Sequence, residues 1–90
     1  MNNLVSLVST LDAEPLIPSS ALPLLPKGSQ VSVIGMFPRI NPRYPDAIER
    51  WIISKDGIQY AVTDALMERS ISADDRKILY ANRQVVFGVA

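Results

Sequence analysis

The sequence predicts a small, mainly β domain, a barrel or a sandwich, that follows an extended arm rich in proline and leucine. The chain of 90 residues has room for one compact domain. All seven prolines lie in the first half, and the last of them is Pro45. After Lys27, short runs of β-branched and aromatic residues alternate with turn residues, as in small barrels and sandwiches. We therefore divide the chain into an arm, residues 1–26, and a β domain, residues 27–90.

The composition argues against most catalytic chemistry. The chain contains neither histidine nor cysteine, so it cannot form a disulfide framework, a thiol nucleophile or a histidine general base. Nine basic residues balance nine acidic ones, which removes the overall attraction on which many nucleic-acid and membrane binders depend. The carboxylates lack the alternating spacing of a calcium loop, so no metal is predicted. The four glycines form no phosphate-binding motif, so no cofactor is predicted. We expect a soluble chain without a signal peptide, in a virion or in the cytoplasm, that binds or assembles.

The arm begins with an ambiguous stretch. Leu4, Leu7 and Leu11 have the spacing of one helical face, which is compatible with a short helix over residues 3–11; a strand or disordered chain are the alternatives. Between Pro15 and Pro26 the prolines disfavour a helix and a central strand, so this part should be extended. It is too apolar for a solvated linker. Its apolar side chains should therefore dock on a neighbouring subunit or wrap the chain's own domain: Leu16, Ile17, Leu22, Leu24 and Leu25.

Three strands are expected in the first part of the β domain. A glycine turn at Lys27-Gly28-Ser29 leads into a strand over residues 30–37, which Pro38 ends. A second strand over residues 48–54 places Trp51 on one face. The Asp-Gly pair that follows readily supplies positive φ and predicts a tight hairpin to a third strand over residues 58–62.

The C-terminal part is expected to continue with short elements. Residues 65–69 suit either one turn of helix capped by Asp64 or an irregular strand end. Ser72 begins a second cap or turn that leads into residues 76–81. Residues 84–90 are β by composition. Adjacent carboxylates diverge along a chain, so Asp74 and Asp75 suit a helix N-terminus or a solvated turn better than a catalytic pair.

The proline-rich loop over residues 37–45 is the second candidate site. It combines cationic and stacking groups, as single-stranded nucleic-acid binders do, in Phe37, Arg39, Arg43 and Tyr44. Arginine and tyrosine are also enriched at protein interfaces. The interpretation we favour is a stiff surface loop with Tyr44 packed on the domain. The acidic residues that follow, Asp46 and Glu49, can pair with these arginines and weaken the positive potential. Trp51 and Tyr60 could belong to the same interface, although a single tryptophan on a central hairpin more often lies in the core.

Two resemblances to known families accompany these patterns. The turn and alternating valines from Lys27 to Val33 resemble the first strand of SH3-like barrels, which implies a fold only. The chain from Lys55 onward resembles the C-terminal half of lambda-type phage head decoration proteins, small β-rich trimers that cement the capsid lattice. Those proteins begin with a polar arm, whereas this chain begins with leucine and proline. The matching features, in order, are the Lys55-Asp56-Gly57 turn, Tyr60, Ser72 to Asp75, Arg76-Lys77, Ala81 and Val85 to Val89.

The leading hypothesis is a non-enzymatic assembly protein whose arm, Leu16 to Leu25, docks on a neighbouring subunit. Its partners would be protein subunits of a larger complex, including further copies of the chain, and the second resemblance implies capsid decoration. The competing hypothesis is a small nucleic-acid-binding barrel that uses the loop from Phe37 to Tyr44. An enzyme is the third, since only generic carboxylates are available for acid–base chemistry.

Overall fold

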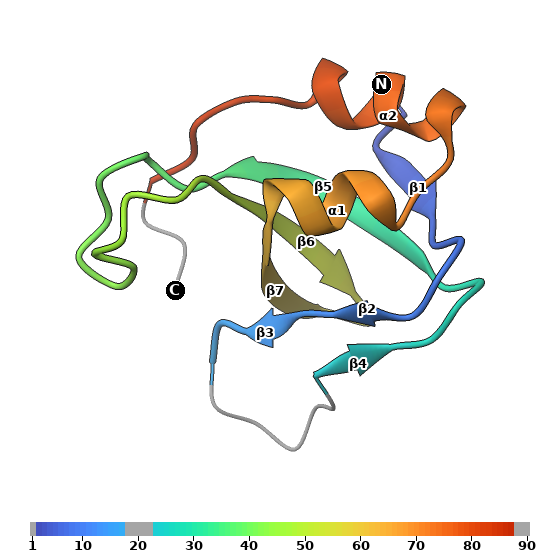
Figure 1. The fold of residues 1–90 in the computed structure, drawn as a ribbon, viewed down its shortest axis with the longest axis horizontal. Coiled ribbons are helices and arrows are strands. Elements are labelled where there is room, and N and C mark those ends of the chain that lie inside the picture. Colours follow the sequence, from blue (N-terminus) through green and yellow to red (C-terminus); the bar gives the residue numbers. More distant parts are fainter. Residues whose placement is uncertain (1, 18–22, 88–90) are drawn as a thin grey trace.

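The computed structural model describes residues 2–17 and 23–87, which form a mainly β domain (Figure 1). Five antiparallel strands form one sheet in the order β1-β5-β6-β7-β3, and β2 and β4 form a second, two-stranded sheet. Within the described residues the two edge strands do not pair with each other, so the expected closed barrel is not formed. The elements are β1 Leu4–Ser6, β2 Leu11–Asp12, β3 Glu14–Pro15, β4 Leu24–Leu25, β5 Gln30–Met36, β6 Arg50–Lys55, β7 Ile58–Thr63, α1 Asp64–Arg69 and α2 Ala73–Ala81.

The centre of the large sheet is the meander of β5, β6 and β7, and the three predicted strands are confirmed there. Lys55 pairs with Ile58, so only Asp56 and Gly57 form the turn between β6 and β7. Their φ angles, 53° and 79°, are both positive, as a two-residue hairpin turn that matches the strand twist requires. The Asp-Gly pair therefore fixes the register of the hairpin locally.

The N-terminal segment, residues 2–17, adds one strand to each edge of this meander: β1 pairs with β5, and β3 pairs with β7. The prediction of a short helix over residues 3–11 is therefore wrong. Val5 and Leu7 are buried in the core, whereas Leu4 is exposed and Ser6 is half-buried, which is the alternation of a strand. The neighbouring strand β5 supplies the hydrogen bonds, and this distant pairing overrides the local helical spacing.

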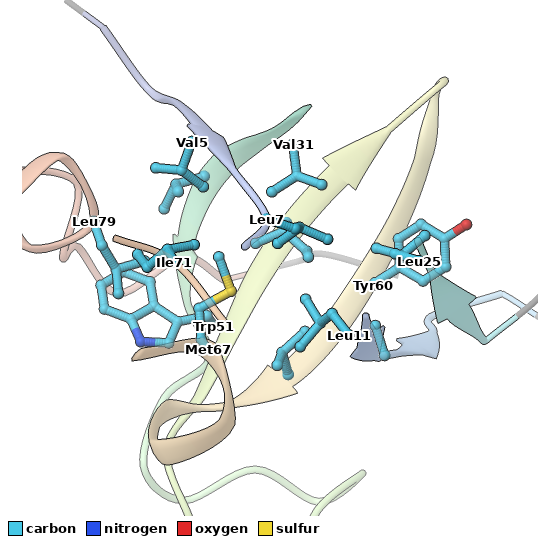
Figure 2. Close-up of a cluster of buried hydrophobic side chains, with 14 of the residues drawn as sticks. Val5, Leu7, Leu11, Leu25, Val31, Trp51, Tyr60, Met67, Ile71 and Leu79 are labelled. Carbon is cyan, nitrogen blue, oxygen red and sulfur yellow. The ribbon is translucent and has the colours of Figure 1, made fainter. Parts of the chain in front are cut away.

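The main core lies on one face of the large sheet (Figure 2). Trp51, Ile53 and Val62 of the meander face α1 and α2, which cover this side with Met67 and Leu79. Ile71, in the link between the two helices, is buried in the same cluster, and Trp51 is fully buried, as expected. Tyr60 is buried in the same cluster. Leu11 of β2 and Leu25 of β4 pair with each other and close one end of the core.

A helix begins at each of the two positions where the sequence suggested a cap. The helical alternative for residues 65–69 is confirmed by α1, but its N-cap is Thr63 and not Asp64. The Asp64 carboxylate instead accepts a hydrogen bond from Nε1 of Trp51 at 2.7 Å, so it satisfies the polar atom of a buried ring. In α2 the Ser72 hydroxyl caps the helix and accepts from the backbone N–H of Asp75. Asp74 and Asp75 thus lie in the first turn of a helix, where carboxylates are favourable.

The predicted strand over residues 84–90 does not form in its described part, residues 84–87, where only Val85 forms a single bridge to Met36. Residues 88–90 lie outside the described chain. The backbone of Met36 nevertheless donates to Gln84 O at 2.7 Å and accepts from Val86 N at 2.9 Å. Gly35 permits this approach, because a Cβ there would lie 2.7 Å from Gln84 O.

No helix within the described residues is long and apolar enough to cross a bilayer.

Candidate interaction surface

A second, smaller apolar cluster lies on the face of the large sheet that the helices leave free. Ile52 alternates with Trp51 and Ile53 along β6 and therefore points to this opposite face. Leu16, Phe37 and Ala61 are buried with it, and Tyr44 and Val86 pack against them. The loop over residues 37–47 and the C-terminal segment over residues 84–87 lie together at one end of the molecule (Figure 1). These two segments cover the second face.

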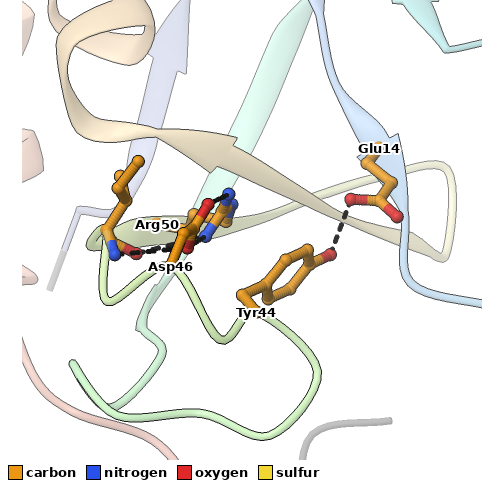
Figure 3. A network of polar contacts seen from close by, with 5 residues as sticks. Glu14, Tyr44, Asp46 and Arg50 are labelled. Carbon is orange, nitrogen blue, oxygen red and sulfur yellow. Dashed lines mark hydrogen bonds and ion pairs between the residues drawn. The ribbon is translucent and has the colours of Figure 1, made fainter.

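The loop holds its shape through a local turn and a link to the N-terminal segment. Asn41 accepts hydrogen bonds from the backbone of both Arg43, at its side-chain Oδ1, and Tyr44, at its backbone O, each at 2.9 Å. The Tyr44 hydroxyl donates to Glu14 Oε2 at 2.8 Å (Figure 3). Arg43 donates from Nη2 to the carbonyl oxygen of Leu16. The loop is thus fastened to the strand that was expected to be part of a docking arm.

The aromatic faces of the loop are already occupied. The rings of Phe37 and Tyr44 lie 5.5 Å apart and are tilted by 45°. The guanidinium of Arg50 lies 4.1 Å from the centroid of the Tyr44 ring, and that of Arg43 lies 5.9 Å from it. The favoured expectation that Tyr44 packs on the domain agrees with these contacts. Phe37 is buried as well, so its ring does not offer the open face that base stacking needs, whereas Tyr44 is half-buried.

The acidic residues after the loop do not pair with Arg39 and Arg43, so this expectation was wrong. Asp46 binds Arg50 through both carboxylate oxygens, at 2.8 and 2.9 Å, and Glu49 binds Arg83 at 2.9 Å. Asp46 precedes Arg50 by four residues, which brings the two side chains together where the loop enters β6. Arg39 and Arg43 therefore form no ion pair within residues 2–17 and 23–87.

These contacts shift the pKa of two side chains, Asp46 and Tyr44. The hydrogen bonds from Arg50 lower the pKa of Asp46 to about 2. Burial raises the pKa of Tyr44, and the hydrogen bond to the Glu14 carboxylate raises it further. Both shifts favour the protonation states that hold the loop together at neutral pH, namely ionised Asp46 and neutral Tyr44.

Two large apolar side chains beside this network are exposed. The exposed fraction is 87% for Ile40 and 79% for Phe87, and both line one hollow of about 210 Å³ together with Phe37, Pro42 and Val86. We call these five residues the Ile40–Phe87 surface. On its other side Ile40 borders a second hollow of about 250 Å³, which Tyr44 and Ala47 also line.

Sequence reasoning identified the loop but missed the two residues that protrude most. Ile40 stands between Arg39 and Asn41 in a run of turn residues, where an apolar side chain has no strand or helix to bury it. That signal is present in the sequence. Phe87 carries no comparable signal, because the β-rich composition of residues 84–90 predicts a paired strand.

The predicted arm residues separate into two groups. Leu16 and Leu25 are buried in the chain's own clusters, whereas Ile17 and Leu24 are 62% and 56% exposed. Leu22 lies outside the described residues. A docking role for Leu16 or Leu25 would require each side chain to leave its present cluster. Of the loop residues, Phe37, Arg43 and Tyr44 lie together, while Arg39 lines a separate hollow with Ile48 and Asp64.

Comparison of the chain with protein-family models, with curated proteins and with solved structures finds no match in any of the three. The site is therefore defined by this chain's own geometry.

Proposed function

We propose that the chain is a non-enzymatic assembly protein that binds a protein subunit of a larger complex through the Ile40–Phe87 surface. The observation that carries the proposal is the exposure of Ile40 and Phe87 beside one shared hollow. Each such side chain gains about 1.5–3 kcal/mol when it is fully removed from water. Adjacent exposed apolar groups next to a hollow are typical of surfaces that bind another protein.

The contacts that hold the loop support this proposal. Tyr44 and Asp46 anchor the C-terminal part of the loop, through Glu14 and Arg50. A surface that is ordered before binding loses little conformational entropy when a partner arrives. The backbone of Ala47, with a φ of 56°, lies in the left-handed region at the edge of the same loop. Such a conformation is unfavourable for alanine by about 1–2 kcal/mol, so the loop is held by its contacts and not by local preference.

Only two of the predicted arm residues remain part of the proposal. Ile17 and Leu24 are its exposed apolar residues among those described, and a partner that reaches past the loop would cover them. Capsid decoration is one function of this class, and the resemblance of the residues from Lys55 onward is its support.

A nucleic-acid-binding module is the second candidate, because Arg39 and Arg43 take part in no ion pair within the described chain. Its weakness is that Phe37 is buried and that Arg50 lies over the ring of the half-buried Tyr44. It requires binding that weakens steeply with salt, since neutralised phosphates release counterions. Binding to a single-stranded oligonucleotide that is salt-sensitive and lost when Arg39 and Arg43 are both changed to alanine would favour it.

Size-exclusion chromatography of native extracts tests the leading proposal. A tagged wild-type chain should elute within a large complex, and a chain with Ile40→Ser and Phe87→Ser should elute free. The matched control carries Leu4→Ser and Val8→Ser, two exposed apolar residues near β1. It should remain in the complex. Circular dichroism establishes that all three chains are folded.

The proposal fails if the Ile40 and Phe87 variant remains in the complex, or if the wild-type chain elutes as a free monomer. Loss of the control variant from the complex would also contradict it, because binding would then depend on the opposite side of the molecule.

A further inference from the structure

We propose that two copies of the chain pair through the C-terminal segment over residues 84–87, as antiparallel strands with the two Val85 residues directly opposite each other. The pairing continues the large sheet of one copy into that of the other. It goes beyond the proposed function, because it uses the backbone of this segment and not the apolar side chains of Ile40 and Phe87. It depends on three properties of the described chain: the free backbone groups of Val85, the closed edges elsewhere in the sheet and the charges beside the segment.

The C-terminal segment is docked on β5 as a short parallel addition at the periphery of the molecule (Figure 1). Met36 of β5 donates from its backbone N–H to Gln84 O at 2.7 Å and accepts from Val86 N at 2.9 Å. The side chain of Gln84 adds a hydrogen bond from Nε2 to Ile34 O at 3.2 Å. One side of the segment is therefore bound to the sheet, and its other side forms a new edge.

The backbone of Val85 lies on this new edge. Hydrogen-bonding groups along an extended chain point alternately to its two sides, so Val85 points away from β5 when Gln84 O and Val86 N point toward it. Its N–H and C=O have no hydrogen-bond partner within residues 2–17 and 23–87, and the residue is 55% exposed. Two directly opposed residues of an antiparallel pair exchange both N–H···O bonds. Val85 thus carries the donor and the acceptor that a second Val85 needs.

The two edge strands of the large sheet are less suited to pairing. The outward N–H groups of β1 already have acceptors: Leu4 N donates to Asn2 Oδ1 at 3.1 Å and Ser6 N to Asp75 Oδ2 at 2.9 Å. At the other edge β3 ends in Pro15, which has no N–H to offer. A strand added at β1 or β3 would lack donors, whereas the C-terminal segment supplies a donor and an acceptor together.

The side chains and charges of the segment are compatible with a second copy. Residues 84–87 carry no charge, and the preceding Arg83 is paired with Glu49 at 2.9 Å, so two copies meet without repulsion between like charges. The register sets the two β-branched Val85 side chains beside each other, a favourable cross-strand pair. It also sets Arg83 opposite Phe87 of the second copy, where a guanidinium and an aromatic ring attract each other.

Sedimentation equilibrium of the full chain, from about 10 μM to about 1 mM, tests the inference, because so short an interface should dissociate on dilution. The mean mass should rise with concentration from that of one chain toward that of two. Val85→Pro removes the outward N–H and should leave the chain monomeric. Val85→Thr, the matched control, keeps the N–H and the β-branched shape and should pair as the wild type does. Hydrogen exchange at the Met36 amide, which donates to Gln84 O, establishes that the segment stays docked.

NMR of a mixture of labelled and unlabelled wild-type chains tests the register. The α proton of Gln84 in one copy should contact that of Val86 in the other, because residues of this pair do not exchange hydrogen bonds and their backbones approach most closely. This contact decides the matter alone if Val85→Pro releases the segment from β5.

A monomer at every concentration would overturn the inference, as would intermolecular contacts confined to other elements. A Val85→Pro chain that pairs while its Met36 amide stays protected would overturn it too. Loss of pairing in Val85→Thr would also contradict it, because the side chain and not the backbone would then hold the two copies together.

Discussion

Tyr44 connects parts of the chain that are far apart in sequence. Its hydroxyl binds Glu14 of β3, its ring lies against Phe37, and the guanidinium of Arg50 covers it (Figure 3). One residue thus joins the N-terminal segment, the loop and the central strand β6. The loop and the predicted arm, which appear in the sequence as alternative sites, are in contact through it.

Asp46 should titrate near pH 2, because the hydrogen bonds from Arg50 lower its pKa from the ordinary value of 3.8. Its contribution to stability is therefore fully present above about pH 4 and is lost as the pH falls through about 2. NMR titration of the side-chain carboxyl measures the shift. Arg50→Gln should move the pKa back toward 3.8, and a pKa that stays near 2 in that variant would contradict the assignment to Arg50.

Gly35→Ala should displace the C-terminal segment, because the new Cβ would lie 2.7 Å from the backbone oxygen of Gln84. We expect the free energy of unfolding to fall by about 1–3 kcal/mol, as in overpacked cores. Hydrogen exchange should also show that the amide of Val86 loses its protection. Gly28→Ala is the control: its φ of 90° is costly for alanine, but the space around it is open, so Val86 should stay protected.

At the scale of elements, β1 is an edge strand that the molecule covers with its own polar groups. The Asp75 carboxylate of α2 accepts from Ser6 N, and Ser70 O accepts from Val8 N at 2.8 Å. This arrangement blocks uncontrolled pairing of edge strands between molecules. Asp75 in the first turn of α2 therefore has a role at β1 in addition to its favourable effect on the helix.

Asp75→Ala should lower the free energy of unfolding by about 1 kcal/mol, because Ser6 N loses its acceptor at a partly buried position. Hydrogen exchange at the Ser6 amide should accelerate. Asp74→Ala is a close control, since Asp74 lies in the same helical turn but is exposed and is not an acceptor for β1. Equal effects of the two substitutions would show that only the helix dipole is involved.

The elements that could be predicted from the sequence are the ones fixed by local chemistry. The Asp56-Gly57 turn and the Ser72 cap depend on residues within a few positions of each other. The strand β1 depends on β5, whose paired residues lie far along the chain, and the leucine spacing alone does not reveal that partner. The same limit applies to the site: Tyr44 was recognisable as a packed loop residue, but the exposure of Phe87 follows from how the C-terminal segment passes Gly35.

At the scale of the whole molecule, the N-terminal residues are part of the domain. They supply a strand at each edge of the large sheet and six buried core side chains. The division at residue 26 therefore does not separate an arm from an independent unit in this structure. The six side chains are Val5, Leu7, Leu11, Ala13, Leu16 and Leu25.

A chain that starts at Lys27 should fail to fold. Each large apolar side chain that is lost contributes about 1.5–3 kcal/mol, and their sum is comparable with the 5–15 kcal/mol that stabilise a typical domain. Circular dichroism should show no cooperative thermal transition. A cooperative transition close to that of the full chain would contradict this account and restore the interpretation of residues 1–26 as a separate arm.

The most direct measurement of the central claim is photo-crosslinking in cells that make the protein. A photoreactive phenylalanine analogue replaces Ile40, Phe87 or, as the control, the exposed Tyr80 of α2. We predict that positions 40 and 87 crosslink to the same partner protein and that position 80 does not. No crosslink from positions 40 and 87, or the same product from position 80, would contradict the proposal that this chain assembles through the Ile40–Phe87 surface.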